Sequence, residues 1–271
     1  MKILPSRLRA ASGVLSLFVV SFLALPLQAA DLAPYRAAYV LKFDGGSSGS
    51  GIVDATGAMT AEWRQTCEGW SVEQRIRMNL VNGEGESLVT DTGYTSWESS
   101  DGLTFRFNVR TLRNDELAEE FGGDAKLNGR GRAGEARFTM PEKRVMKLPA
   151  GTLFPMAHSE LLLRAAESGK QRVFATVFDG ATKEGVAEVS AIIGKRGIVA
   201  HSEKSEPLTA RPFWPVRLAF FDVGSDEAAP HYELGMRMFD NGVAGDQIMD
   251  FGDFRMRAVL TEIEPLPKPK C

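Results

Sequence analysis

Hydrophobic and polar residues alternate along most of the chain after residue 31. In residues 70–80 the even positions, from Trp70 to Leu80, are mostly apolar, and the odd positions are polar or charged. A period of two places successive side chains on opposite faces, so this stretch predicts a half-buried β-strand. The same pattern predicts further strands at residues 35–43, 49–63, 86–97, 103–112, 117–121, 125–127, 135–140, 144–148, 172–178, 188–193, 213–222, 232–239 and 248–263.

Short turn signals separate these strands. Asn-Gly at 82–83 and Ser-Ser-Asp-Gly at 99–102 are typical of connections between neighbouring antiparallel strands. Gly-Gly at 122–123 and Asn-Gly at 128–129 predict two more turns, and Thr-Gly at 56–57 predicts a turn or bulge within one strand. Because the hairpins follow one another, the predicted sheet is antiparallel.

One segment has a different period. Residues 161, 162, 165 and 166 are leucine or alanine on one stripe, and Gly169 follows, so residues 156–168 predict an amphipathic helix with a glycine cap. Residues 195–211 are the least periodic and predict a loop. We therefore predict a mainly β fold, a long antiparallel sheet of many strands, curved or partly closed, that the helix plugs or covers.

The first 30 residues have the composition of a secretory signal peptide. Basic residues precede an apolar run at 10–25, and the small residues Ala29 and Ala30 follow it. The run is shorter than the roughly 20 residues of a membrane-spanning helix, so we expect cleavage after Ala29 or Ala30. Residues 31–271 would then form one domain on the far side of a membrane.

Net charge argues against nucleic acid as a partner. The precursor has 35 acidic and 32 basic residues, a net charge of −3. Removing the three basic residues of the first 30 leaves 29 against 35, a net charge of −6. The basic residues form no run, as a nucleic-acid footprint would require.

Cys67 and Cys271 are the only cysteines in the sequence. In an oxidising compartment a pair of thiols is expected to form a disulfide, and two free thiols are the alternative. Closing a loop of about 200 residues would stabilise the fold by roughly 5 kcal/mol at most. The bridge would bracket nearly the whole exported chain, which favours one domain.

No catalytic or metal-binding constellation emerges. Residues 45–49 match the nucleophile-elbow pattern around Ser47, but that motif needs a following helix, and a strand is predicted there. His158, His201 and His231 lack the spacing of metal ligands. His158 is interpreted as a packing or capping residue, with a general base as the alternative. We expect no enzymatic activity, no cofactor and no metal.

Acidic and aromatic residues gather late in the chain. The acids at 240–253 lack the ligand spacing of a calcium loop, and Asp-Asn-Gly at 240–242 predicts a hairpin turn. Aromatic and methionine residues line the strands from 213 to 254. Core packing explains them, and an apolar cavity for a lipid-like ligand is the alternative.

The chain resembles the EipB family of cell-envelope integrity proteins from alpha-proteobacteria. The resemblance covers nearly all of residues 31–271 and depends on the order of several motifs. These are Ala33-Pro34-Tyr35, Tyr39, the segment from Trp63 to Trp70 around Cys67, Thr152-Leu153-Phe154-Pro155, His158, Phe178-Asp179-Gly180, Phe213-Trp214-Pro215 and Cys271.

The resemblance implies a periplasmic protein whose long sheet coils into a β-spiral, an open barrel-like form stapled by a disulfide between Cys67 and Cys271. It also implies a non-enzymatic role in envelope integrity, outer-membrane homeostasis and stress resistance, with a periplasmic tetratricopeptide-repeat protein as partner. A carrier or sensor that holds a lipid or lipoprotein acyl chain in the concave sheet is the alternative. The candidate ligand or partner surface comprises Trp63, Trp70, His158, Phe213 and Trp214.

Overall fold

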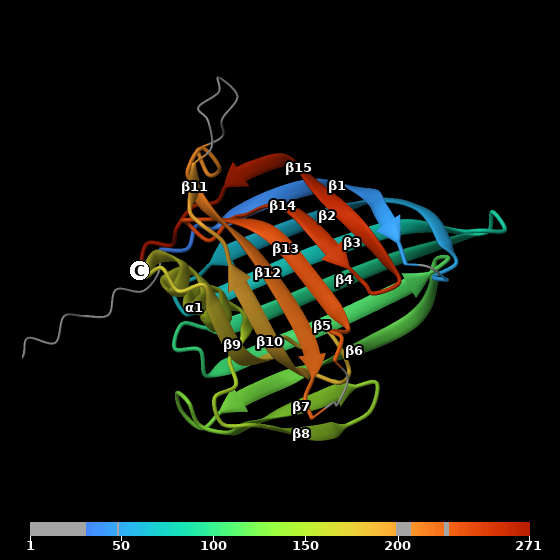
Figure 1. Ribbon diagram of the computed structural model, residues 1–271. Helices are drawn as coiled ribbons and strands as arrows, with labels where there is room; N and C mark the ends of the chain where they lie inside the picture. The colour runs from blue at the N-terminus through green and yellow to red at the C-terminus, as the bar shows by residue number, and fades with distance from the viewer. Residues whose placement is uncertain (1–30, 48, 199–206, 225–227) are drawn as a thin grey trace, which may run out of the picture.

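The computed structural model describes residues 31–271 apart from 48, 199–206 and 225–227. The predicted signal peptide and its cleavage site lie outside the described residues. The described chain contains one helix and fifteen strands, all strands belonging to one sheet (Figure 1). The elements are β1 (Tyr35–Gly46), β2 (Ile52–Gln65), β3 (Gly69–Asn82), β4 (Ser87–Ser99), β5 (Thr104–Arg113), β6 (Glu116–Leu127), β7 (Gly134–Met140), β8 (Arg144–Leu148), α1 (Pro155–Glu167), β9 (Arg172–Phe178), β10 (Val186–Ile193), β11 (Gly197–Ile198), β12 (Pro212–Asp222), β13 (Tyr232–Phe239), β14 (Ala244–Asp250) and β15 (Phe254–Pro265).

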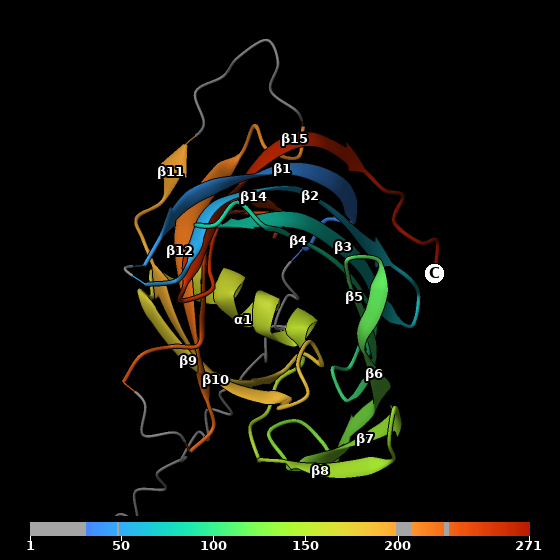
Figure 2. The ribbon, with the colours of Figure 1, turned by 90° about the vertical axis from the view of Figure 1, so that its right-hand side faces the viewer.

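Fourteen strands follow the order β8-β7-β6-β5-β4-β3-β2-β1-β15-β14-β13-β12-β10-β9, and β11 pairs with β12 outside this path. The named strands pair antiparallel, as the hairpin signals predicted. The sheet curls around α1, which Figure 2 shows surrounded by strands. The predicted mainly β, barrel-like sheet with one helix is confirmed.

The two ends of this path, β8 and β9, come close to closing the barrel. The segment after β8 runs parallel to β9, with the Leu153 amide donating to the Thr176 carbonyl and the Phe178 amide donating to the Leu153 carbonyl, both at 2.9 Å. The Tyr94 hydroxyl of β4 donates to the Asp179 carbonyl at 2.8 Å. This bond attaches the β9–β10 connection to β4.

Helix α1 begins one residue before the predicted start. Pro155 occupies its first turn, where a missing amide hydrogen costs nothing. Its end is a Schellman motif, because the Lys170 amide bonds the Ala165 carbonyl, the Gly169 amide bonds the Ala166 carbonyl, and Gly169 has a φ of +76°. The apolar side of α1 packs against β3, β9, β10 and β12.

The turn predicted at 122–123 lies inside a strand instead. Strand β6 continues through Gly122 and Gly123, where the register shifts by a bulge rather than reversing. A Cβ on Gly123 would lie 2.1 Å from the Arg137 carbonyl oxygen, so glycine permits close strand approach here. Strand β2 is one continuous strand through Gly57, as predicted, but its bulge lies nearer its start, between Ile52 and Asp54.

The predicted strand at 248–263 is two strands, β14 and β15. The chain turns at residues 251–253, where Gly252 has a φ of +83° and its amide bonds the Asp250 carboxylate at 3.0 Å. Phe251 and Phe254 continue the hydrophobic pattern across the turn, so the pattern did not predict a reversal of the chain there. The predicted loop at 195–211 contains the short strand β11, and residues 199–206 lie outside the description.

A disulfide joins Cys67, in the turn between β2 and β3, to Cys271 at the end of the chain. The two Cα atoms are 5.6 Å apart across a sequence separation of 204. The segment after β15 runs without helix or strand, and the Leu266 amide bonds the Pro34 carbonyl at 3.0 Å. The tail is therefore attached to the start of β1 as well as to the β2–β3 turn.

Candidate functional site

The concave face of the sheet and α1 enclose a cleft of about 490 Å³ at the end of the barrel that carries the disulfide turn. Its volume lies within the usual range for small-molecule sites. Apolar and charged side chains share its lining. The apolar ones are Leu32, Trp70, Leu103, Leu127, Leu153, Met156, Ala157 and Leu161, and the charged ones are Asp31, Glu98, Asp101, Arg130, Glu160 and Arg164.

Glu98 is the deepest charged group of this cleft. It is the next-to-last residue of β4, is buried, and accepts hydrogen bonds from the Met156 amide at 2.7 Å and the Ala157 amide at 3.0 Å. The first turn of α1 has no acidic residue of its own, so Glu98 supplies the negative charge that a helix N-terminus favours. Burial raises the pKa of Glu98 to about 7 against the opposing effect of these bonds, and Glu160 raises it further.

Charges on the cleft rim are mostly paired. Arg164 and Glu160 are one helical turn apart and form an ion pair of 3.0 Å. Arg130 lowers the pKa of Asp101, although the Ser99 hydroxyl and the Leu103 amide contribute more. The cleft can therefore accept an apolar chain between its walls while presenting both charge signs at its mouth.

His158 lies on the buried side of α1 and does not line this cleft. Burial alone lowers its pKa to about 4, so the imidazole is neutral at physiological pH. Its Nε2 atom has no hydrogen-bond partner. Among the described residues, the histidine that pairs with a carboxylate is not His158 but His231 on the surface, which contacts Asp222. The packing interpretation of His158 fits this environment.

The structure brings only part of the predicted ligand or partner surface together: Trp70 and Trp214 share the core cluster around α1 and Trp63 packs against it, whereas Phe213 packs against another cluster. Trp70 lines the cleft. Trp63 stacks on Tyr35 with ring centres 6.2 Å apart, and Phe213 packs edge-to-face against Phe239 at 6.0 Å. Trp214 is buried in the core cluster around α1.

Other sequence candidates occupy structural positions. The Ser47 hydroxyl donates to the Asp253 carbonyl at 3.1 Å in the connection before β2, and no helix follows it. Asp246 accepts a bond from Arg237 at 2.6 Å and one from the Leu260 amide at 3.0 Å. No group of three histidine, cysteine or acidic side chains within the described part of the chain could hold a metal ion. No described helix is long and apolar enough to cross a bilayer.

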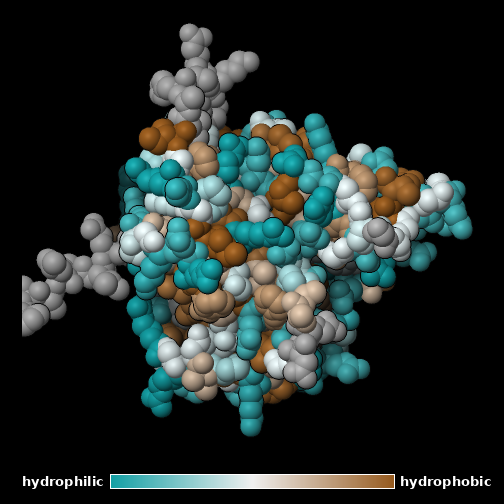
Figure 3. Space-filling view, viewed as in Figure 1, coloured by the Kyte–Doolittle hydropathy of each residue, from teal (hydrophilic) through white to brown (hydrophobic). Residues whose placement is uncertain are grey.

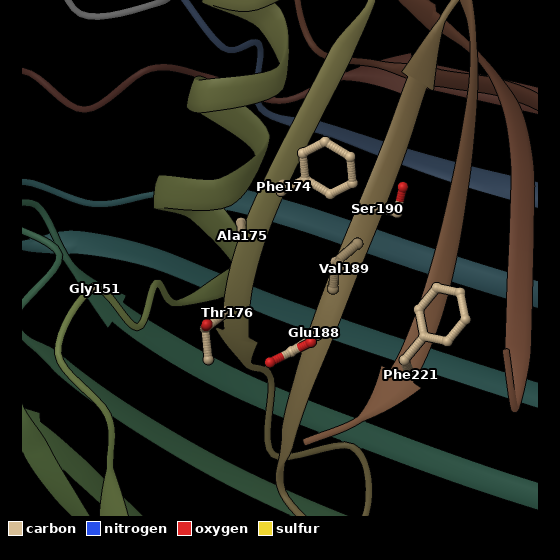
Figure 4. Close-up of a pocket in the computed structure, with 8 residues that line it drawn as sticks. All are labelled: Gly151, Phe174, Ala175, Thr176, Glu188, Val189, Ser190 and Phe221. Carbon is tan, nitrogen blue, oxygen red and sulfur yellow. The ribbon is translucent and has the colours of Figure 1, made fainter. Parts of the chain in front are cut away.

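A second concave feature lies on the outer face of β9, β10 and β12. Figure 3 shows hydrophobic patches among the hydrophilic cover of this side of the molecule. Here a groove of about 530 Å³ runs between Phe174 and Phe221, and Figure 4 shows both rings beside Glu188 and Ser190. Phe174 is 75% exposed. We call this feature the phenylalanine groove.

The sequence analysis missed the phenylalanine groove, although a signal was present. In β9 the inward positions are Val173, Ala175 and Val177, so Phe174 stands on the face that Arg172 and Thr176 share. A large aromatic residue on the polar face of a strand is therefore the sequence signal that could have located this groove.

The profile of the EipB-like family matches residues 26–267. The chain is 32% identical over 266 residues to the cell envelope integrity protein EipB of Brucella abortus (strain 2308), covering 95% of this chain and 94% of that protein. It is also similar to the crystal structure of a β-barrel-like protein of a domain of unknown function from Brucella abortus. That structure has a TM-score of 0.82 and 31% identity, and the match covers 88% of this chain and all of the other.

The match extends over the described fold from the segment before β1 to the end of β15. It includes the turn that holds Cys67, the segment that pairs with β9 before α1, and the β9–β10 connection at Asp179. Sequence and fold agree in this comparison, so the chain belongs to the EipB-like family.

Proposed function

We propose that this protein is a periplasmic, non-enzymatic factor that maintains cell envelope integrity by binding a protein partner. A related protein of Brucella abortus carries the name cell envelope integrity protein. The observation that carries partner binding is the phenylalanine groove, which combines an edge strand with two aromatic side chains. A tetratricopeptide-repeat protein of the periplasm is the partner we propose.

The groove has the features of a protein contact site. Phe174 lies opposite Ser190 in the β9–β10 pairing, and Phe221 lies opposite Glu188 in the β10–β12 pairing. The polar side chains of Ser190 and Glu188 therefore lie at the bottom of the groove, between the two aromatic rings. Exposed aromatic side chains supply much of the binding energy at protein interfaces. Leu153 already pairs with the end of β9 at Thr176 and Phe178, so an extended segment of a partner would pair beside the earlier residues of β9, around Phe174.

Complementation tests this proposal. In cells that lack the protein, the double variant Phe174→Ser/Phe221→Ser should reach normal levels yet fail to restore resistance to detergent. The matched control is Leu117→Ser/Val145→Ser, because these side chains are 55% and 63% exposed on β6 and β8. Equal restoration by both variants would remove the groove from the function.

The cleft beside α1 favours a second function, as a carrier or sensor of a lipid or lipoprotein acyl chain. Its apolar wall and charged mouth suit an amphiphile. Native mass spectrometry of protein purified without detergent should then detect a bound lipid, and Leu161→Trp, which fills the cleft, should lose it. A uniformly empty wild-type protein would exclude this function.

A further inference from the structure

Four exposed cations cluster where α1 ends and β9 begins. Lys170 lies between α1 and β9, Arg172 is the first residue of β9, and Lys195 and Arg196 follow β10. We call these four residues the basic rim. Lys170, Lys195 and Arg196 line one hollow of about 300 Å³, in which Glu167 is the acidic side chain.

Backbone pairing holds the basic rim together. The Ile193 amide donates to the Gln171 carbonyl at 2.9 Å, which places the end of β10 beside the start of β9. The Gly194 amide donates to the Pro215 carbonyl at 2.7 Å and fixes the following residues on β12. The guanidinium of Arg196 then lies 5.9 Å from the centre of the Trp214 ring. The four cations therefore belong to one continuous surface.

Two isoleucines project from the same surface. Ile192 is opposite Arg172 in the β9–β10 pairing and is 57% exposed. Ile198 is opposite Pro212 in the β11–β12 pairing and is 78% exposed. Large aliphatic side chains at this exposure are costly in water, and their position among cations distinguishes them from scattered surface hydrophobics.

The basic rim is not neutralised by its neighbours. On the adjoining strands, Arg217 pairs with Glu233 and Arg237 pairs with Asp246. None of the four rim cations forms an ion pair with a described residue. Four positive charges against Glu167 leave a local charge of +3 on a chain whose net charge is −3.

We propose that the basic rim, with Ile192 and Ile198, docks on an anionic phospholipid surface. Cations combined with protruding aliphatic side chains bind such surfaces by electrostatic attraction and by insertion at the headgroup level. The cations lie on long side chains spread over the α1–β9 connection, the start of β9 and the segment after β10, which suits a diffuse negative surface better than one fixed carboxylate. This docking is independent of the phenylalanine groove, so either can fail without the other.

Vesicle co-sedimentation tests the proposal with the exported protein. Binding should occur with vesicles of phosphatidylcholine and phosphatidylglycerol, should be absent with phosphatidylcholine alone, and should weaken as salt rises. Lys195→Glu/Arg196→Glu should weaken it on the order of tenfold or more. Ile198→Ser should weaken it while leaving the salt dependence in place.

The matched control is Lys126→Glu/Lys147→Glu, which makes the same charge change at exposed positions of β6 and β8. It should bind as the wild type does. Equal loss in both double variants, or no binding to anionic vesicles, would overturn the proposal. Self-association without vesicles that Lys195→Glu/Arg196→Glu abolishes would also overturn it, since the face would then join two copies. Circular dichroism and melting should first establish that each variant is folded.

Discussion

At the scale of single residues, Glu98 links the sheet, the helix and the cleft. Its carboxylate holds the first amides of α1 from a neighbouring strand rather than from the helix itself. The side chain is 3% exposed, and its pKa is raised to about 7 because burial disfavours the charged form. A group with this pKa changes charge near physiological pH, so the charge at the N-terminus of α1 should depend on pH.

The titration of Glu98 makes the free energy of unfolding depend on pH. The pKa of Glu98 in the folded state exceeds the ordinary glutamate value of 4.5. Its contribution to the free energy of unfolding is therefore full below pH 4.5 and is lost as pH rises through 7. Glu98→Gln removes the titration and keeps an acceptor for an amide of α1. We expect the wild type to lose stability relative to this variant between about pH 5 and about pH 8.

Denaturant unfolding of both proteins across this range measures the difference. If the two stability curves run parallel with pH, the raised pKa of Glu98 is wrong.

Sequence patterns identified part of the site at this scale. Trp70 was one of the five residues of the predicted ligand or partner surface, and it lines the cleft. Glu98 and Phe174 were missed, because their roles depend on what the curled sheet brings beside them. Glu98 meets α1 across a sequence separation of 58, and nothing local signals that contact.

At the scale of elements, alternation located the strands well but did not distinguish bends from reversals. A Gly-Gly pair suits a turn and also suits a bulge, so Gly122-Gly123 was read as a turn although β6 passes through it. Across 251–253 the apolar pattern continued although the chain reversed. At both places the neighbouring strands decide whether the chain bends or reverses. A local sequence pattern carries no information about those neighbours.

Gly123 offers a direct test of the bulge. A methyl group there would lie 2.1 Å from the Arg137 carbonyl oxygen of β7, so Gly123→Ala must push two paired strands apart. We expect a loss of roughly 1–3 kcal/mol in the free energy of unfolding. The control is Gly93→Ala in β4, where the nearest atom is 4.0 Å away and little change is expected. Denaturant unfolding compares them, and equal stability of the two variants would contradict the close approach.

At the scale of the whole molecule, the pairing of Leu153 with β9 joins the two ends of a long sheet, and the disulfide ties the end of the chain to that sheet. The bridge spans 204 positions and joins the β2–β3 turn to the chain end. The sheet has two ends, and its closure depends on the short pairing at Leu153. Two cysteines in a chain with a predicted signal peptide predicted the bridge, whereas the pairing at Leu153 had no sequence signal of its own.

Removing either sulfur should have the same effect. Cys67→Ser and Cys271→Ser should lower the melting temperature equally, and the double variant should be no less stable than either. The loss has an upper bound of about 5 kcal/mol, set by the entropy of closing so long a loop. Thermal melting without reductant measures it. Additive losses would show that the two thiols act separately.

The central claim is that the phenylalanine groove contacts a protein partner, and cross-linking in living cells tests it most directly. A photo-reactive amino acid in place of Phe174 should trap one protein, a periplasmic tetratricopeptide-repeat protein, identified by mass spectrometry. The same substitution at Val145, exposed at 63% on β8, should not trap it. An empty result at position 174, or the same products from both positions, would contradict the account.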